Sequence, residues 1–298
     1  MNLPKPTTLL ASGVELAAGT ALATPTPTLP AASLVQAAVA HAAMAQPGTF
    51  ASADALLDAL EVADQGIDRL SSRVRYTRFF AIAGDMQQRV GDLYFVADVR
   101  PASARREGLP RRAFRVDFET LMVGRRVEQE QKTYVFDGEW LAERAPAEKL
   151  FIKQQIAPPG ESVDPLRIGE GPFVVPVGQR KAEIVKRYSA TLAPEAEGIS
   201  QWPSLAARAA GTVQLKLEPL ATYVDQSDHE TIRVWYDRGS LLPVLALTVG
   251  FDGDTTVVEM LDVLTNDNAR MDDAAFDTTP PSEPGWDVQV REWRGDTE

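Results

Sequence analysis

The side chains on which most enzymes depend for catalysis are scarce in this chain. The sequence holds two histidines, His41 and His229, and no cysteine. A Ser-His-Asp triad would need His229 as its base, and His229 lies in the polar stretch "DQSDHETI", directly before a strand-like segment. We therefore predict no catalytic residue. A hydrolase that uses His229 remains an alternative, ranked below the two functions given at the end of this subsection.

Candidate ligands for a metal or a phosphate are also weak. Asp228, His229 and Glu230 are sequence neighbours, and neighbours on a strand point to opposite faces, so they cannot chelate one ion together. The pair Asp272-Asp273 could flank a sugar bond, but nothing fixes its spacing. "RIGEGPF" lacks the Lys-Ser/Thr and the strand-then-helix context of a phosphate loop. The sequence predicts no metal and no cofactor.

Composition excludes several further classes. The chain has 298 residues, enough for one large or two ordinary domains. Without cysteine there is no disulfide, no thiolate site and no lipid-modified N-terminal Cys. The net charge is −12, and an acidic chain repels phosphate backbones, so we predict no nucleic-acid partner. Much of that charge lies in an acidic C-terminal tail, while the region from Arg69 to Lys132 is locally basic.

The first 46 residues differ from the rest. They are rich in Ala, Thr and Pro, and an apolar run ends in Ala43-Met44-Ala45, a pattern that signal peptidase accepts. We predict a signal or leader segment over 1–46, hence export; the alternative is a flexible or weakly helical arm. No run reaches the ~18 apolar residues that a membrane-spanning helix needs, so the chain is predicted not to span a bilayer.

Beyond this segment, the hydrophobic pattern first predicts a helix and then a series of strands. Residues 52–70 carry one apolar stripe ending at Ile67 and Leu70, with Ser52 as N-cap. The period then changes to two, as in "RRAFRVDFETL" and "GTVQLKLEP", with Asp-Gly turns at 137–138 and 252–253. Alternation over roughly ten strands indicates an antiparallel sheet, curved or barrel-like, in an α+β protein.

Residues 157–210 interrupt the strands and are expected to form a helical insertion, either a lid or a connection. "QRKAEIVKRYSATL" reads as its helix, with Ile184, Val185 and Tyr188 on one side. The domain organisation predicted is a leader (1–46) and a single domain (47–298).

An aromatic hairpin at 133–154 gathers Tyr134, Phe136, Trp140 and Phe151 around Asp137-Gly138. We expect this hairpin to face an apolar hollow in the sheet; the alternative is an ordinary filled β-core. The residues predicted to line the hollow are Tyr76, Phe95, Phe114, Val116, Phe118, Tyr134, Phe136, Leu215, Leu217, Val234 and Tyr236.

Several short motifs, in sequence order, resemble those of the outer-membrane lipoprotein carriers, the LolA-like family. The resemblance covers about residues 52–290. It rests on Leu70-Ser71-Ser72, "GDLYF" (91–95), Arg100-Pro101, "VFDGEWLAER" (135–144), "VWYDRGSLLPVLALT" (234–248) and "LTNDNARMDDAAFDTTPPSEPGWDV" (264–288).

The resemblance implies a fold and a ligand. The family's fold is an incomplete β-barrel, a strongly curved antiparallel sheet whose open side is covered by helices. The implied function is a periplasmic carrier that binds acyl chains of lipoproteins, or another lipid, and takes them to the outer membrane. Its partners would be an inner-membrane donor and an outer-membrane acceptor, and Arg100 would latch the lid. The second alternative is an envelope sensor on the same scaffold.

Overall fold

The computed structural model describes residues 49–99, 111–156, 168, 177, 180–271 and 275–293. The chain divides into two units, Met1–Met44 and Ala45–Glu298, and every described residue belongs to the second. The predicted leader, Arg100 and nearly all of 157–179 lie outside the described residues, so those predictions stay untested. None of the helices in the described ranges has both the length and the apolar character to traverse a bilayer.

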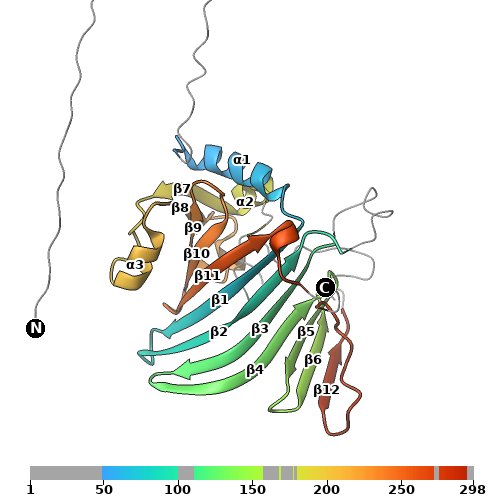
Figure 1. The fold of residues 1–298 in the computed structure, drawn as a ribbon. Helices are drawn as coiled ribbons and strands as arrows, with labels where there is room; N and C mark the ends of the chain where they lie inside the picture. Colours follow the sequence, from blue (N-terminus) through green and yellow to red (C-terminus); the bar gives the residue numbers. More distant parts are fainter. Residues whose placement is uncertain are drawn as a thin grey trace, which may run out of the picture. The chain divides into compact units, whose positions relative to one another are not determined.

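Twelve strands form one open sheet, and its order is β12-β6-β5-β4-β3-β2-β1-β11-β10-β9-β8-β7 (Figure 1). All neighbours pair antiparallel except β12 and β6. The expected α+β fold, an open antiparallel sheet with helices, is confirmed. The strands are β1 (Arg69–Phe80), β2 (Asp85–Val96), β3 (Ala113–Val123), β4 (Arg126–Phe136), β5 (Trp140–Ala145), β6 (Leu150–Gln155), β7 (Tyr188–Ala193), β8 (Thr212–Pro219), β9 (His229–Asp237), β10 (Pro243–Gly250), β11 (Thr255–Thr265) and β12 (Asp287–Arg291).

Both predicted Asp-Gly turns are confirmed. Gly138 and Gly253 have φ of +102° and +84°, values that favour glycine. Asp137 fixes the first turn, because its Oδ1 accepts hydrogen bonds from the backbone N–H groups of Glu139 (3.0 Å) and Trp140 (2.9 Å). The β4–β5 hairpin is therefore specified locally by its own sequence.

Helix α1 spans Ala53–Asp64, and Ser52 Oγ accepts a hydrogen bond from Ala55 N at 3.2 Å, as an N-cap does. The expectation of a helix up to Leu70 is wrong. The chain turns at Gly66, and β1 has begun by Leu70, which pairs with Phe95. Leu70 is buried as expected, but as a strand residue of the sheet and not on a helix.

The helices cover different faces of the sheet. Helices α1 and α2 (Lys181–Arg187) pack on one face, called here the α1 face. Helix α3 (Pro203–Ala209) packs on the other, called the outer face. The segment 157–210 is thus not one helical insertion, since it also contains β7. Val185 is 45% exposed rather than buried, because α2 buries Ile184 and ends before Tyr188.

The C-terminal segment returns to the sheet. Its path crosses β3–β5, where Arg115 donates to Ala275 O (3.3 Å), Thr278 Oγ1 donates to Asp137 Oδ2 (2.8 Å) and Arg144 donates to Thr279 O (3.0 Å). It ends in β12, which pairs parallel with β6 as the edge strand. The expected acidic tail is therefore in part a strand of the sheet, which the sequence reasoning did not predict.

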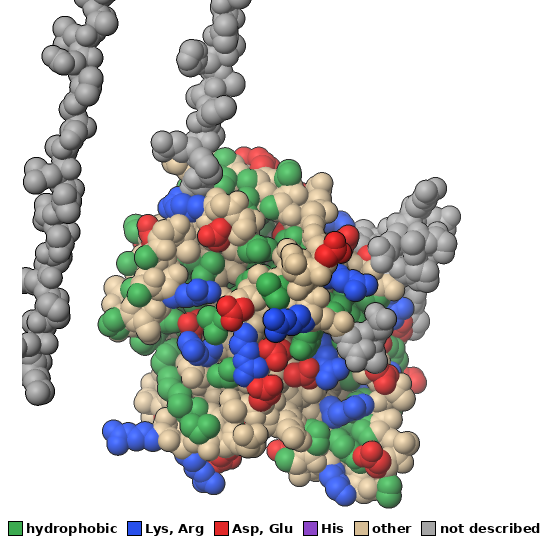
Figure 2. Space-filling view, viewed as in Figure 1, with side chains coloured by type: hydrophobic (Ala, Val, Ile, Leu, Met, Phe, Trp, Pro, Cys, Tyr) green, Lys and Arg blue, Asp and Glu red, His purple; other side chains and the backbone are tan. Residues whose placement is uncertain are grey.

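Charged side chains of the basic stretch are paired across strands. Arg73 contacts Asp92 (3.1 Å) and Glu119 (2.7 Å), and Arg75 contacts Glu259 (2.9 Å). Figure 2 shows the same interleaving, with basic and acidic side chains side by side over the sheet. The Arg73 pairs are partly exposed and add little stability each, whereas Glu259 is buried; together these pairs neutralise the local charge.

Candidate functional site

The α1 face of the sheet carries two clusters of buried apolar side chains. Cluster 1 joins β7–β11 to α1 and α2, and cluster 2 lies over β1–β4. The buried members of cluster 1 are Ala53, Leu56, Leu57, Leu60, Ile168, Ile184, Tyr188, Val213, Leu215, Leu217, Ile232, Val234, Tyr236, Ala246 and Val258. Those of cluster 2 are Ile67, Leu70, Val74, Leu93, Phe95, Phe114, Val116, Phe118, Phe136, Val177 and Met260.

The structure brings all eleven predicted lining residues to this face. Nine are buried: Phe95, Phe114, Val116, Phe118 and Phe136 in cluster 2, and Leu215, Leu217, Val234 and Tyr236 in cluster 1. Tyr134 is partly buried against cluster 2, and Tyr76 packs against both clusters and so joins them. Their role as lipid contacts stays a prediction.

Cluster 2 is the more aromatic of the two. Phe114 and Phe136 stack at 5.8 Å between ring centroids, and Phe118 meets Tyr76 (6.1 Å) and Tyr134 (6.3 Å) edge to face. Each such pair is worth about 1 kcal/mol beyond the area it buries. The strand register explains the grouping, because Phe114 lies opposite both Phe95 and Phe136.

The cover over the two clusters differs. Cluster 1 lies beneath α1, which contributes Leu56, Leu57 and Leu60. Within the described ranges, no residue of a helix belongs to cluster 2; non-strand side chains such as Ile67 and Val177 pack there instead. Among the described residues, the side chains that close the aromatic half of the face therefore come from outside the helices.

Helix α2 is tied to its surroundings by one apolar and two basic side chains that can be described. Its buried residues are Ile184 and Arg187. Arg187 donates to the carbonyl oxygens of Glu183 (3.0 Å) and Ile168 (3.4 Å), so it ties Ile168 to this helix. Lys181 Nζ lies 2.7 Å from the carboxylates of both Asp54 and Asp58 on α1, and these hydrogen bonds, that of Asp54 first, raise its pKa. An exposed ion pair thus connects the two covering helices.

The aromatic hairpin does not face one side, contrary to expectation. Phe136 pairs with Leu141 on the α1 face, so Trp140 and Phe151 point to the outer face. There Lys153 lies 4.8 Å from the Trp140 ring and Arg144 lies 5.7 Å from the Phe151 ring. The physical reason is strand alternation. Trp140 is the neighbour of Leu141, and neighbouring residues of a strand point to opposite faces of the sheet.

Ion pairs border the apolar surface beyond Tyr134. Arg89 Nε lies 2.8 Å from Glu130, and Lys132 pairs with Glu143 while its ammonium lies 5.6 Å from the Tyr134 ring. Burial opposes the charge on Lys132, but Glu143 beside it raises the pKa on balance. Burial also raises the pKa of the Tyr134 hydroxyl. The α1 face is thus apolar near the helices and ionic farther along β2–β5.

His229 begins β9, next to Gly250 of β10. Burial lowers its pKa, against the opposing effect of Asp228 and Asp252. Across the described ranges, no three His, Asp or Glu side chains are grouped as a metal site would require. The hydroxyl of the neighbouring Ser227 donates to His229 O and accepts from His229 N, so its described hydrogen bonds are to the backbone of His229.

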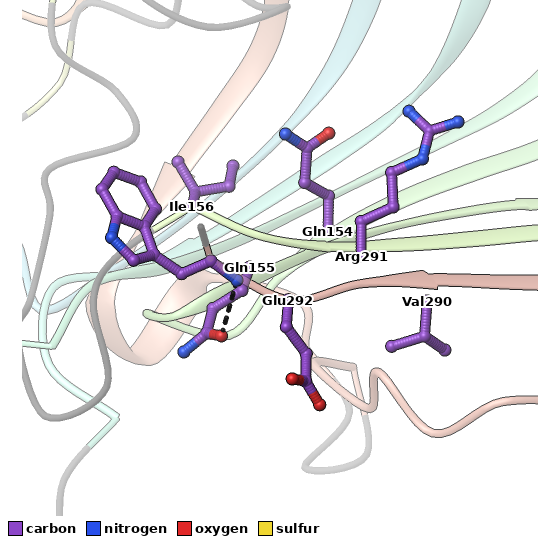
Figure 3. A pocket seen from close by; sticks show the side chains of 7 residues that line it. Gln154, Gln155, Ile156, Val290, Arg291 and Glu292 are labelled. Carbon is purple, nitrogen blue, oxygen red and sulfur yellow. Dashed lines mark hydrogen bonds between the residues drawn. The ribbon is translucent and has the colours of Figure 1, made fainter. Parts of the chain in front are cut away.

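A groove of about 920 Å³ lies at the ends of β6 and β12, far along the sheet from cluster 1. Gln154 and Arg291 point to one side of it, and Gln155 and Glu292 to the other (Figure 3). Gln155 Oε1 accepts a hydrogen bond from Trp293 N (3.0 Å), which closes the end of the strand pair. Four of its seven lining side chains are polar or charged, so this groove is poorly suited to an acyl chain.

Sequence reasoning missed several members of the α1 face. Leu241 and Leu242, in the β9–β10 turn, pack against clusters 1 and 2 respectively. Asp237 shapes that turn by accepting from Gly239 N and from Ser240 N and Oγ, with Leu241 at a φ of +57°. Tyr188 was placed on a helix, whereas it begins β7. The run "SLLPV" was a usable signal, since two leucines in a turn seldom both stay exposed.

No protein-family model matches this chain, and no curated protein matches it by sequence. Solved structures do resemble it. A putative outer membrane lipoprotein-sorting protein domain from Vibrio parahaemolyticus matches with 10% identity and a TM-score of 0.32, over 74% of this chain and 94% of that one. A LolA superfamily protein from Nitrosomonas europaea matches with 11% identity and a TM-score of 0.25, over 76% and 98%.

The Pseudomonas aeruginosa MucA/MucB complex also matches, with 15% identity and a TM-score of 0.39, over 75% of this chain and only 60% of that one. At such identities and TM-scores these likenesses say nothing about ligand or partner. Proteins named for the LolA superfamily and for lipoprotein sorting are thus among the solved structures that this chain resembles.

Proposed function

We propose that this protein is a carrier that holds acyl chains, of lipoproteins or of other lipids, against the α1 face of its sheet. The eleven side chains from Tyr76 to Tyr236 named above would form the contact surface. In this proposal the protein works in the cell envelope after export and performs no catalysis.

The observation that supports this proposal most is the cover of cluster 2. Phe95, Phe114, Phe118 and Phe136 are each no more than 3% exposed, yet no described helix packs on them. A permanent core is normally closed by a packed layer of secondary structure. Where the described cover of an apolar face contains no helix, we expect that cover to be displaced at small cost and replaced by a ligand.

The energetics set what such a cover must do. Each buried methylene contributes about 0.8 kcal/mol, so a chain of ~15 methylenes gains roughly 12 kcal/mol, too much for easy release. Displacing Ile168, Val177 and Ile184 from the clusters offsets part of that gain, because their own apolar burial is lost. The cover therefore tunes affinity as well as shielding the empty site.

The partners belong to the proposal as well. A lipid carrier needs a donor in the inner membrane and an acceptor in the outer membrane, and Arg100 remains the proposed latch. In addition, Arg187 would help to hold the cover closed, because it donates hydrogen bonds to Ile168 O and Glu183 O and so fixes Ile168 to α2.

A tryptophan introduced on the α1 face tests the site. Phe118→Trp puts an indole in cluster 2, and the matched control Phe151→Trp puts one on the outer face, where Phe151 is equally buried. A fatty acid brominated along its chain should quench the added fluorescence of Phe118→Trp and leave that of Phe151→Trp unchanged. Equal quenching, or none in either variant, would refute the site.

Native mass spectrometry of the purified protein provides the second readout, since a carrier should retain acyl ligand. The sensor alternative makes a different prediction. It requires that a membrane regulator captured by this protein still binds when Phe118→Glu has abolished lipid binding, with Val127→Glu at an exposed site as the control.

A further inference from the structure

Tyr188 carries a buried hydroxyl that nothing described so far employs. The residue is 1% exposed and belongs to cluster 1. Within the part of the chain that the structure describes, its Oη has no hydrogen-bond partner. Burial raises the pKa of this hydroxyl to about 12, so it keeps its proton throughout the physiological range.

The side chains of Ser227 and Tyr223 lie near the Tyr188 hydroxyl and shift its pKa in opposite directions. The Ser227 hydroxyl, which lowers this pKa, already donates to His229 O (2.8 Å) and accepts from His229 N (3.2 Å). The Tyr223 ring lies 5.5 Å away, edge to face, and the Arg187 guanidinium lies 5.4 Å from the Tyr188 ring. In the described residues, the Tyr188 hydroxyl is thus a buried donor without an acceptor, with a guanidinium close to its ring.

Buried donors are almost always paired, and one left unpaired destabilises the protein. Phenylalanine would fill the same space without this cost. A hydrogen-bond acceptor on a ligand removes this penalty. The acceptor must be small, because the side chain of Tyr188 is packed among its neighbours.

We propose that Tyr188 Oη donates a hydrogen bond to the carbonyl oxygen of an acyl ester or amide whose chain lies on cluster 1. This rests on the proposed function and names the part of the ligand that Tyr188 binds. Tyr188 begins β7, and the next residue of β7 on the same face, Ala190, pairs with Leu217, which pairs with Ile232. A chain anchored at Tyr188 therefore has apolar side chains to follow along the α1 face.

The nearby Arg187 strengthens the case for an oxygen acceptor. Its guanidinium also lies 5.7 Å from the Tyr223 ring, and it binds the carbonyl oxygens of Glu183 and Ile168. A positive charge at this distance favours the carbonyl oxygen, which carries partial negative charge, over an apolar group.

The experiment compares two ligands and two variants. The ligands are monolauroylglycerol, an ester, and dodecylglycerol ether, which has the same head and chain length but no carbonyl. Their affinities are measured, below micelle formation, by displacement of a fluorescent fatty acid from delipidated full-length protein. The variants are Tyr188→Phe and, as matched control, Tyr94→Phe, whose hydroxyl lies on the outer face opposite Arg115.

Wild-type protein should bind the ester about five- to tenfold more tightly than the ether, the ratio expected for one hydrogen bond. Tyr188→Phe should abolish that difference by weakening the ester alone, and its lipid-free thermal stability should be equal to or above wild type. Tyr94→Phe should preserve the difference.

A Tyr188→Phe variant that still prefers the ester by the wild-type ratio would overturn this inference and leave the proposed carrier standing. Equal binding of ester and ether by the wild type would do the same. If the wild type bound neither amphiphile, the proposed function would fail together with the inference. An amide probe, N-lauroylglycine, shows whether the carbonyl preference extends from esters to amides.

Discussion

Truncation of Phe118 to alanine distinguishes a permanent core from a ligand surface. Phe118 is 3% exposed and meets Tyr76 and Tyr134 edge to face, at 6.1 and 6.3 Å. Removing a buried phenylalanine side chain costs about 3–5 kcal/mol, through lost burial and the void left behind. At roughly 2–4 °C per kcal/mol for a domain of this size, lipid-free Phe118→Ala should melt about 10 °C below the wild type.

Saturating acyl ligand should reduce that loss. The void left by the phenyl ring admits about two methylenes, so the bound variant should recover roughly 1.5 kcal/mol relative to wild type. The assay is urea unfolding followed by near-ultraviolet circular dichroism, with and without ligand. Phe79→Ala is the control, because Phe79 stacks on Trp202 at 4.9 Å on the outer face. An identical loss in both conditions for Phe118→Ala, or an equal rescue of Phe79→Ala, would refute the reasoning.

Three further changes test the supporting structure. Lys181→Ala removes the ion pairs between α2 and the two carboxylates of α1, so bound acyl ligand should leave faster in stopped-flow exchange, and high salt should erase the difference. Gly91→Ala would place a Cβ 1.9 Å from the Asp117 carbonyl oxygen, so soluble yield and melting temperature should both fall sharply, whereas Gly239→Ala, with its nearest neighbour at 3.5 Å, should fold normally. Hydrogen bonds in the β9–β10 turn lower the pKa of Asp237, so its ionised carboxylate stabilises the fold above the pKa of the unfolded state. In urea unfolding, Asp237→Ala should therefore lose its full amount of stability at pH 7. This loss should vanish as the pH falls below the pKa of the folded carboxylate.

The sheet was predictable wherever one face of a strand is wet. Phe114, Val116 and Phe118 alternate with Arg115 and Asp117 in β3, and a two-residue period is sufficient to place them. The Asp-Gly turns were predictable for a similar reason, since each depends on a few adjacent residues. The lining of the α1 face followed from these two local rules.

Features that depend on distant contacts were not predictable. Trp140 and Phe151 look like partners of Phe136 in the sequence, but the register of β4 with β5 places them on the outer face. The parallel edge strand β12 depends on where the C-terminal segment crosses the sheet, and no local pattern encodes that path. Tyr188 was missed because the helix ending at Arg187 passes directly into β7, without a glycine or proline between them.

The unequal cover of the sheet also predicts that its two halves differ in local stability. Strands β9–β11 bury side chains on both faces, with α1 above Val234 and Val258 and α3 beneath Trp235 and Leu247. Over β1–β4, no residue of a described helix belongs to the apolar cluster of the α1 face. Amide hydrogens of β9–β11 should therefore exchange with solvent more slowly than those of β1–β4, where the sheet can open locally without global unfolding. A rigid anchor joined through β1 and β11 to a compliant half could admit cargo of varying chain length without global unfolding.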